Sequence, residues 1–493
     1  MRRFREGHYE PAWLHCQRVA DSDGPLLAQR PSRGDAEASG RARKTLKKVE
    51  KQTLDGRKEM ISLRRKKSIL AAVAATSLAL VASSVPANAE VGVSSTEIKL
   101  GITVPQTGIA APGYNKVAPA MKAYFNYIND NGGVYGRKIN LIIKDDKYIP
   151  QEAINKTNEL ILKDKVFALV GQLGTANHLA VASKVRLASR NIPSLYLNTG
   201  YSGFADVKKF KTSFMHFPTY AMEAKILSTY IKENFAGKTT CLVSQNDDFG
   251  ADAGAGFTAA GLTFNETVKY ISGQQADRTL VAGWVTKLAA AKCEVVVLFS
   301  VSSATAAILG VSGAAGFKPQ WILGSVGADA TTIRIAANNP QASALMNGAI
   351  GASWLPDSAD TTDEYIKFFR EINTKYNPGV DFDNNVLVGM NAGLLTVQAL
   401  RAAGSNPTRR SLLAALESKG ATFASASYSA SAVSKTSHAG HTGYWFGKFN
   451  LAGSLVPVDA ARTIYTTDSG SGPVTKATAK RAALPAKGIP TNS

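Results

Sequence analysis

Apolar and polar positions alternate along residues 97–353 as short apolar runs separated by longer amphipathic stretches. Runs of this kind are typical of buried strands, and apolar residues spaced three or four apart are typical of helices. The pattern predicts strands at 98–104, 138–143, 167–170, 193–197, 240–244, 267–271, 294–299, 320–323 and 349–353. It predicts helices around Met121 to Ile128 and at 151–162, 220–234, 251–263, 278–291, 303–315 and 328–338.

Strands that alternate with helices favour parallel sheets with helices on both faces. The series starts again at residue 240, so we expect an α/β fold with two Rossmann-like lobes. Beyond residue 353 the pattern predicts helices at 361–375, 384–403 and 408–418, then a Ser/Ala-rich loop at 421–443. Strands at 444–449 and 463–466 are expected to close the fold.

The stretch 167–190 is the unit around which the first series is organised. A buried apolar run leads through a glycine-containing turn into a helix, and Thr175 stands where we expect the N-cap. The first N–H groups of a helix have no intrahelical partner, so this turn predicts a site for an anionic group such as a carboxylate. An ordinary capped turn with a purely structural role is the alternative.

In open parallel sheets, ligands bind beyond the carboxyl ends of the strands. This rule selects loops from both expected lobes, so a cleft between the lobes would collect them. The loops are 107–114, 174–177, 198–200, 247–249, 299–300 and 324–325, and their candidate ligand-binding residues are Tyr114, Thr175, Ala176, Asn177, Asn198, Thr199, Gly200, Phe249, Ser300 and Ser325.

The N-terminal region carries an export signal. Four basic residues at 64–67 precede an Ala/Ser/Leu/Val run at 69–85, and small residues at A-x-A spacing end at Ala89. We therefore expect a signal peptide at 60–89, cleaved after Ala89, with a transmembrane anchor as the alternative. No cysteine stands at the cleavage site, so no lipid anchor is expected. Residues 1–59 are interpreted as a mis-assigned start or a disordered leader.

The basic charge is spread between the leader and the rest of the chain. The net charge is +20, of which residues 1–89 hold 18 Lys/Arg against 9 Asp/Glu. Four further basic residues lie in the Pro/Ala/Gly-rich tail at 469–493, which we expect to be disordered. The remainder is mildly basic and has no basic helix, so nucleic acid is not an expected partner.

Export leaves Cys241 and Cys293, each at the start of an apolar strand-like run. Matched ends of neighbouring parallel strands would bring them within disulfide range, and two buried free thiols remain the alternative.

Catalytic and cofactor motifs are missing: the chain contains no P-loop, G-x-S-x-G or H-E-x-x-H sequence. His438 and His441, three apart in a loop, are weak metal candidates without a nearby cysteine or carboxylate. We therefore expect a binding protein that needs no cofactor and no metal, rather than an enzyme.

Six short stretches carry a resemblance to a known family: 98–102 (IKLGI), 128–136 (INDNGGVYG), 144–146 (KDD), 170–175 (VGQLGT), 191–193 (NIP) and 246–250 (NDDFG). On these residues the chain resembles the extracytoplasmic solute-binding proteins of ABC importers. Within them it is similar to the branched-chain amino acid (Leu/Ile/Val) family of the type I periplasmic binding fold. The resemblance covers residues 97–466.

The resemblance implies two lobes joined by a three-segment hinge near 217–220, 354–357 and 440–445. Lobe I would comprise 90–217 plus 356–441, and lobe II 218–355 plus 442–468. A monomer would bind a small-molecule ligand and deliver it to permease and ATPase subunits encoded separately. A ligand-sensing ectodomain of the same fold, acting through a separate partner, is the alternative function, and a hydrolase using Ser or Asp in the cleft is a third.

The resemblance also implies roles for individual residues. Thr175 and the neighbouring helix N–H groups would hold a ligand carboxylate, and Asn198, Thr199 and Gly200 would add contacts. Phe249 would pack on the ligand from lobe II, and Tyr114 from lobe I. Ser325 stands where amino-acid binders place the carboxylate that pairs with the ligand ammonium. Either Asp247, Asp248 or Asp329 substitutes for it, or the ligand is an amide, a urea-like compound or a small carboxylic acid.

Overall fold

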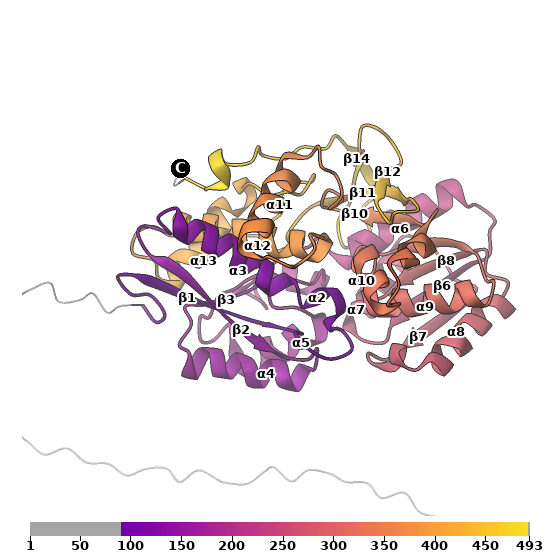
Figure 1. Ribbon diagram of the computed structural model, residues 1–493, viewed down its shortest axis with the longest axis horizontal. Helices are drawn as coiled ribbons and strands as arrows, with labels where there is room; N and C mark the ends of the chain where they lie inside the picture. The colour runs from indigo at the N-terminus through magenta and orange to yellow at the C-terminus, as the bar shows by residue number, and fades with distance from the viewer. Residues whose placement is uncertain (1–89, 492–493) are drawn as a thin grey trace, which may run out of the picture. The chain divides into compact units, whose positions relative to one another are not determined.

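The computed structural model describes residues 90–491, which fold around two β-sheets (Figure 1). The expected leader at 1–59 and signal peptide at 60–89 lie outside these residues. The first sheet is parallel in the order β2-β1-β3-β4-β5, and with its helices it forms lobe I. Its strands are β1 (Glu97–Val104), β2 (Lys138–Asp145), β3 (Ala168–Val170), β4 (Ser194–Leu197) and β5 (Ser213–Met215).

The second sheet forms lobe II and runs in the order β14-β13-β11-β10-β9-β8-β6-β7, with β12 paired to β11. Strands β6 to β10 pair in parallel, and the strands from β11 onward pair antiparallel. The strands are β6 (Thr240–Gln245), β7 (Glu266–Tyr270), β8 (Val295–Phe299), β9 (Gln320–Leu323), β10 (Ile350–Ser353), β11 (Gly443–Phe449), β12 (Leu455–Pro457), β13 (Ile464–Thr466) and β14 (Thr475–Ala477). The expected α/β fold with two lobes is confirmed.

Helices cover both faces of each sheet, and Figure 1 shows α3, α11 and α12 on one side of the first sheet with α4 on the other. Lobe I holds α2 (Ala111–Tyr114), α3 (Val117–Asp130), α4 (Pro150–Asn158), α5 (Thr175–Val181), α11 (Glu364–Tyr376), α12 (Asn384–Ala402) and α13 (Arg409–Lys419). Lobe II holds α6 (Tyr220–Asn234), α7 (Asp248–Ala259), α8 (Arg278–Ala290), α9 (Ser302–Ala314) and α10 (Ala330–Ala336). Within residues 90–491, no helix combines the length and the apolar character needed to cross a membrane.

The chain crosses between the lobes after β5, after β10 and before β11, and aromatic side chains pack where it does so. The ring of Trp354 stacks on His441 with centroids 4.9 Å apart and meets the edge of His216 at 4.8 Å. His438 stacks on Phe214 at 3.8 Å. The two histidines considered as metal candidates are thus buried in the packing between crossings, and no cluster of three metal-binding side chains occurs among the described residues.

A disulfide joins Cys241 at the start of β6 to Cys293 just before β8. Adjacent parallel strands place the two Cα atoms 5.8 Å apart, within the range that a disulfide spans. Of the two alternatives left open by the sequence, the structure has the bonded one.

The C-terminal strap, residues 467–491, was expected to be disordered from 469 but packs on both lobes. On lobe II, β14 pairs with β13, and Lys225 donates from Nζ to Asp468 over 2.7 Å. On lobe I, Arg481 pairs with Asp363 at 2.6 Å. Lys225 and Asp363 are distant from the strap in sequence, so the Pro/Ala/Gly-rich composition of the tail did not indicate them.

Arg481 attaches the strap to lobe I through its guanidinium group. Its guanidinium lies over the rings of Tyr365 and Tyr428, at 4.7 and 4.8 Å from their centroids. Further along the strap, the carbonyl of Gly488 accepts a hydrogen bond from the buried Tyr124 hydroxyl at 2.8 Å. An Arg at such a site contributes by packing, by cation–π contact and by its ion pair.

Replacing Arg481 by alanine is expected to lower the free energy of unfolding by about 2 kcal/mol, because the buried Asp363 loses its ion pair and Tyr365 loses the cation over its ring, whereas Tyr428 keeps Arg462. Urea denaturation of the variant and the wild type measures the difference. Lys480→Ala is the matched control, since the Lys480 side chain is exposed and its backbone bond to Tyr428 is unaffected. Equal stability of the two variants would show that the strap is not anchored through Arg481.

Candidate functional site

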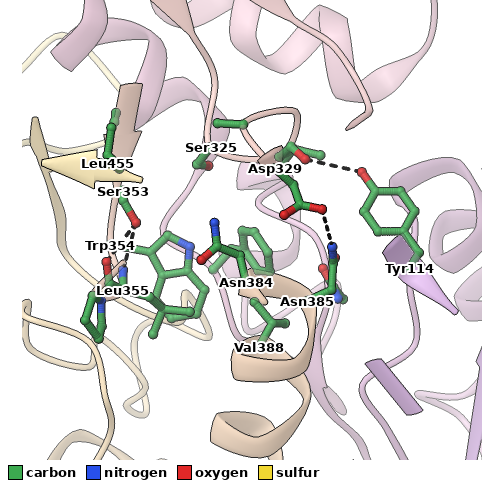
Figure 2. Close-up of a pocket in the computed structure, with 16 residues that line it drawn as sticks. Tyr114, Ser325, Asp329, Ser353, Trp354, Leu355, Asn384, Asn385, Val388 and Leu455 are labelled. Atoms are coloured by element: carbon green, nitrogen blue, oxygen red, sulfur yellow. Dashed lines mark hydrogen bonds between the residues drawn. The ribbon is translucent and has the colours of Figure 1, made fainter. Parts of the chain in front are cut away.

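Two adjoining compartments lie between the lobes, and both are lined by Tyr114, Asn198 and Val326. The larger receives side chains from lobe I, lobe II and the crossings. Its polar lining includes Ser325, Asp329, Ser353, Asn384 and Asn385, with Trp354 and Phe217 beside them (Figure 2). The smaller is lined by Tyr114, Tyr148, Leu173, Gly174, Thr175, Asn198, Tyr220, Phe249, Val301 and Val326.

The lobes touch across these compartments. The hydroxyl of Tyr114 donates to the carbonyl of Val326 over 3.4 Å, and burial raises the pKa of Tyr114 to about 12. The backbone N–H of Ser202 in lobe I donates to the carboxylate of Asp252 in lobe II over 2.9 Å. The structure therefore has the two lobes closed on one another.

Thr175 lines the smaller compartment, but its capping role was predicted wrongly. Gly174, with φ of 104°, precedes the helix, and Thr175 is the first residue of α5. The Thr175 hydroxyl instead forms a 2.7 Å hydrogen bond with the hydroxyl of Thr199. Only glycine reaches such a φ without strain, so the turn at Gly174 brings the start of α5 to the compartment wall.

The loop after β4 contributes through three consecutive residues. Asn198 lines both compartments. Thr199 lines neither, but its hydroxyl forms the hydrogen bond with Thr175. A Cβ added to Gly200 would lie 2.6 Å from the carbonyl oxygen of Pro218 and 2.7 Å from the Tyr220 ring. Gly200 does not line a compartment itself. Its missing side chain lets the Tyr220 ring pack against the loop, and Tyr220 lines the smaller compartment.

Phe249 and Tyr114 line the smaller compartment from opposite lobes, as the resemblance implied for them. Phe249 packs against Tyr220 and Phe299, with ring centroids 4.7 and 5.1 Å away. These contacts fix the orientation of the ring, because each partner is itself buried.

Five predicted ligand contacts do not line either compartment: Thr199 and Gly200, whose places are described above, and Ala176, Asn177 and Ser300. The Ser300 hydroxyl bonds that of Thr305 at 2.8 Å inside lobe II. Asn177 is buried next to Asp146. Burial raises the pKa of the Asp146 carboxyl to about 7, and the Asn177 amide opposes that shift. The rule that selected them locates loops and does not say which side chain of a loop faces the cleft.

Of the three carboxylates considered as ammonium partners, only Asp329 lines a compartment. Its Oδ2 atom accepts from the N–H of Thr332 at 3.0 Å and from the Asn385 amide at 3.1 Å, whereas Oδ1 has no hydrogen-bond partner among residues 90–491 (Figure 2). Asp247 is occupied as the N-cap of α7, accepting from Phe249 and Gly250, and Asp248 is exposed.

Ser325 sits on a buried carboxylate that the sequence analysis missed. Glu223 of α6 accepts the N–H of Ser325 at 2.5 Å and its hydroxyl at 3.0 Å. Burial raises the pKa of Glu223 to about 7, and the hydrogen bonds from Ser325 oppose that shift. An acid among the apolar residues of the first turns of α6 was the signal available, but its partner lies 102 residues away.

Glu223 is expected to make the protein less stable as pH rises. Its pKa in the folded state, about 7, exceeds the ordinary value of 4.5, so the stabilisation present below pH 4.5 is lost as pH rises through 7. Relative to Glu223→Gln, the wild type should lose at least about 1.4 kcal/mol of unfolding free energy between pH 5 and 8, the value of one pKa unit.

Urea denaturation at several pH values measures this difference. The matched control is Glu233→Gln in the same helix, where the side chain is exposed. Parallel pH profiles for the wild type and both variants would contradict the assignment.

No Lys, Arg or His belongs to the described lining of either compartment, and Asp329 is its one charged side chain. The arrangement combines hydroxyls, amides, aromatic rings and a single carboxylate with a free oxygen. Such a lining suits a small ligand that is neutral, zwitterionic or singly positive, since an unpaired anion has no cation to meet here.

Known proteins share sequence features and the fold with this chain. The profile of the family described as "Periplasmic binding protein" matches residues 97–454. The relative named Leu/Ile/Val-binding protein homolog 3, from Brucella melitensis biotype 1, is 24% identical over 306 residues, covering 57% of this chain and 80% of the relative.

Solved structures show the same fold. A branched-chain amino acid ABC transporter protein from Thermus thermophilus, with bound valine, is 20% identical with a TM-score of 0.66, covering 76% of this chain and 98% of that one. A fatty acid ABC transporter substrate-binding protein from Thermomonospora curvata is 21% identical with a TM-score of 0.60, covering 82% of this chain and 98% of that one.

Proposed function

The chain belongs to the periplasmic binding protein family, and on this premise we propose that it is the extracytoplasmic solute receptor of an ABC importer. It captures a branched-chain amino acid, or a related small amide or carboxylate, between its lobes. The observation that carries this proposal is the pair of compartments lined from both lobes and from the crossings. A ligand held there contacts groups that meet only in the closed state, so binding favours closure.

For an amino acid, the proposed orientation follows from the two ends of the site. The ammonium group pairs with the free Oδ1 of Asp329, and the carboxylate lies near Thr175 and the first N–H groups of α5. The apolar side chain then packs among Tyr114, Tyr220 and Phe249. Neutral amides satisfy the same polar groups without a charge, whereas a carboxylic acid that lacks the ammonium leaves Asp329 unpaired.

The names of two structural neighbours support a role in ABC transport: one is a branched-chain amino acid ABC transporter with bound valine, and the other is a fatty acid ABC transporter substrate-binding protein. We propose that the chain is exported, that the signal peptide is cleaved after Ala89, and that the protein acts as a monomer. Permease and ATPase subunits would be separate proteins. Glu90 supports this cleavage point, because its carboxylate accepts the N–H of Arg409 over 3.2 Å and so ties the new N-terminus to lobe I.

The decisive experiment is a thermal-shift and calorimetric screen of residues 90–493 against aliphatic amino acids, their amides and short-chain carboxylic acids. A ligand at 100 times its Kd adds about 2.7 kcal/mol to the stability, a shift of several degrees in Tm. A folded protein that no member of the panel stabilises would contradict solute capture.

A further inference from the structure

Tyr148 is a compartment residue to which the sequence analysis assigned no role. It follows β2 in lobe I, lines the smaller compartment, and faces Tyr114, Tyr220 and Phe249 there. Two consecutive non-glycine residues, Lys147 and Tyr148, have φ of 54° and 61°. The left-handed region is unfavourable for such residues, and where it occurs the surroundings must hold the backbone in place.

Two adjacent carboxylates hold this turn. Asp145 Oδ1 accepts the N–H of Lys147 at 2.9 Å, and Asp146 Oδ1 accepts the N–H of Tyr148 at 2.9 Å. Asp146 is fully buried, and Asp145 also accepts the N–H of Gln106 at 2.9 Å. The turn is therefore fixed from within lobe I, and the direction in which the Tyr148 side chain leaves the backbone is fixed with it.

The Tyr148 ring covers the start of α5 and reaches lobe II. A Cβ added to Gly174 would lie 2.9 Å from Tyr148 Cε2, so the ring rests directly on the turn that presents Thr175. The ring lines the smaller compartment together with Tyr220, Phe249 and Val326 of lobe II. Burial raises the pKa of Tyr148 well above its usual range, and nearby Asp247 raises it further. The ring thus stands between the lobes at one end of the compartment.

We propose that Tyr148 sets the size of the ligand, its ring forming the end wall of the smaller compartment in the closed protein. This inference rests on the proposed function and adds the residue that limits which side chains fit. A ring on a fixed backbone turn excludes bulk more effectively than a flexible side chain, because the bonds to Asp145 and Asp146 hold the backbone and the ring packs on the turn at Gly174.

The test compares the wild type with Tyr148→Ala and Tyr148→Phe for L-valine, L-leucine and L-phenylalanine, by calorimetry. Tyr148→Ala should raise the ratio of phenylalanine to valine affinity at least tenfold. Tyr148→Phe should keep the wild-type ratio, since the ring and not the hydroxyl forms the wall. Lys147→Ala is the matched control, because the exposed Lys147 has the same left-handed backbone but no contact with the compartment. An unchanged ratio in Tyr148→Ala overturns the proposal.

Binding of phenol is a second test, and it separates this inference from the proposed function. Phenol has the size and shape of the side chain removed in Tyr148→Ala, so it can fill the space that the ring leaves, whatever the natural ligand is. If the wild type binds none of the three amino acids, solute capture fails for that class and phenol decides the role of Tyr148. Millimolar phenol should raise the Tm of Tyr148→Ala and leave the wild type and Lys147→Ala unchanged. Equal shifts in all three proteins overturn the proposal.

Discussion

Replacing Asp329 by asparagine is expected to weaken binding of an ammonium-bearing ligand about 100-fold, equivalent to about 3 kcal/mol, because the buried ammonium then lacks its counter-ion. Asparagine is a suitable probe, since it still caps α10 and can still accept from Thr332 and Asn385. The fold should therefore persist while the charge is lost. Calorimetry with L-valine or the best amino acid from the screen measures the effect.

Asp248→Asn is the matched control, because Asp248 is an exposed carboxylate that lines neither compartment. A neutral amide of the same shape as the amino acid supplies a second comparison, since its affinity should change little in Asp329→Asn. Equal loss of amino acid and amide binding would show that Asp329 acts through the structure of the lobe and not through charge.

Removing the disulfide is expected to lower the free energy of unfolding by about 4 kcal/mol. The bond closes a loop with a sequence separation of 52, and the unfolded chain without it gains the corresponding freedom. The double variant Cys241→Ala/Cys293→Ala also loses two buried side chains, which adds to the effect. Urea denaturation under oxidising conditions measures the change.

A reductant provides the control for this variant. It should move the denaturation midpoint of the wild type toward that of the double variant and leave the double variant where it is. A wild type that is equally stable with and without reductant would contradict a stabilising role for the bond.

The strand and helix pattern predicted most of the fold because long apolar runs and amphipathic stretches are local signals. The expected helices at 278–291 and 384–403 match α8 and α12 to within a residue at each end. Strands β5, β12 and β14 were missed, and each has three residues, too few to show a period. Tertiary pairing with a neighbouring strand, rather than local sequence, makes these segments extended.

The site was predicted in part, since the rule on strand ends names loops but not directions. It selected Tyr114, Thr175, Asn198, Phe249 and Ser325, which the structure brings to the two compartments, and also Ser300, which points into lobe II. It did not select Tyr148, Tyr220 or Glu223. Their places depend on a left-handed turn, a glycine that permits close approach, and a hydrogen bond across lobe II.

The periodicity of apolar residues was enough to predict two α/β lobes from the sequence. The positions of the expected strand ends were enough to predict the loops that flank a cleft. Side-chain direction, the partner of each carboxylate and the path of the strap emerged only once the chain was folded. The physical reason is range: periodicity acts over a few neighbouring residues, whereas Glu223 with Ser325 and Asp363 with Arg481 join residues more than 100 positions apart. Contacts of that length depend on how the lobes pack, which no local pattern encodes.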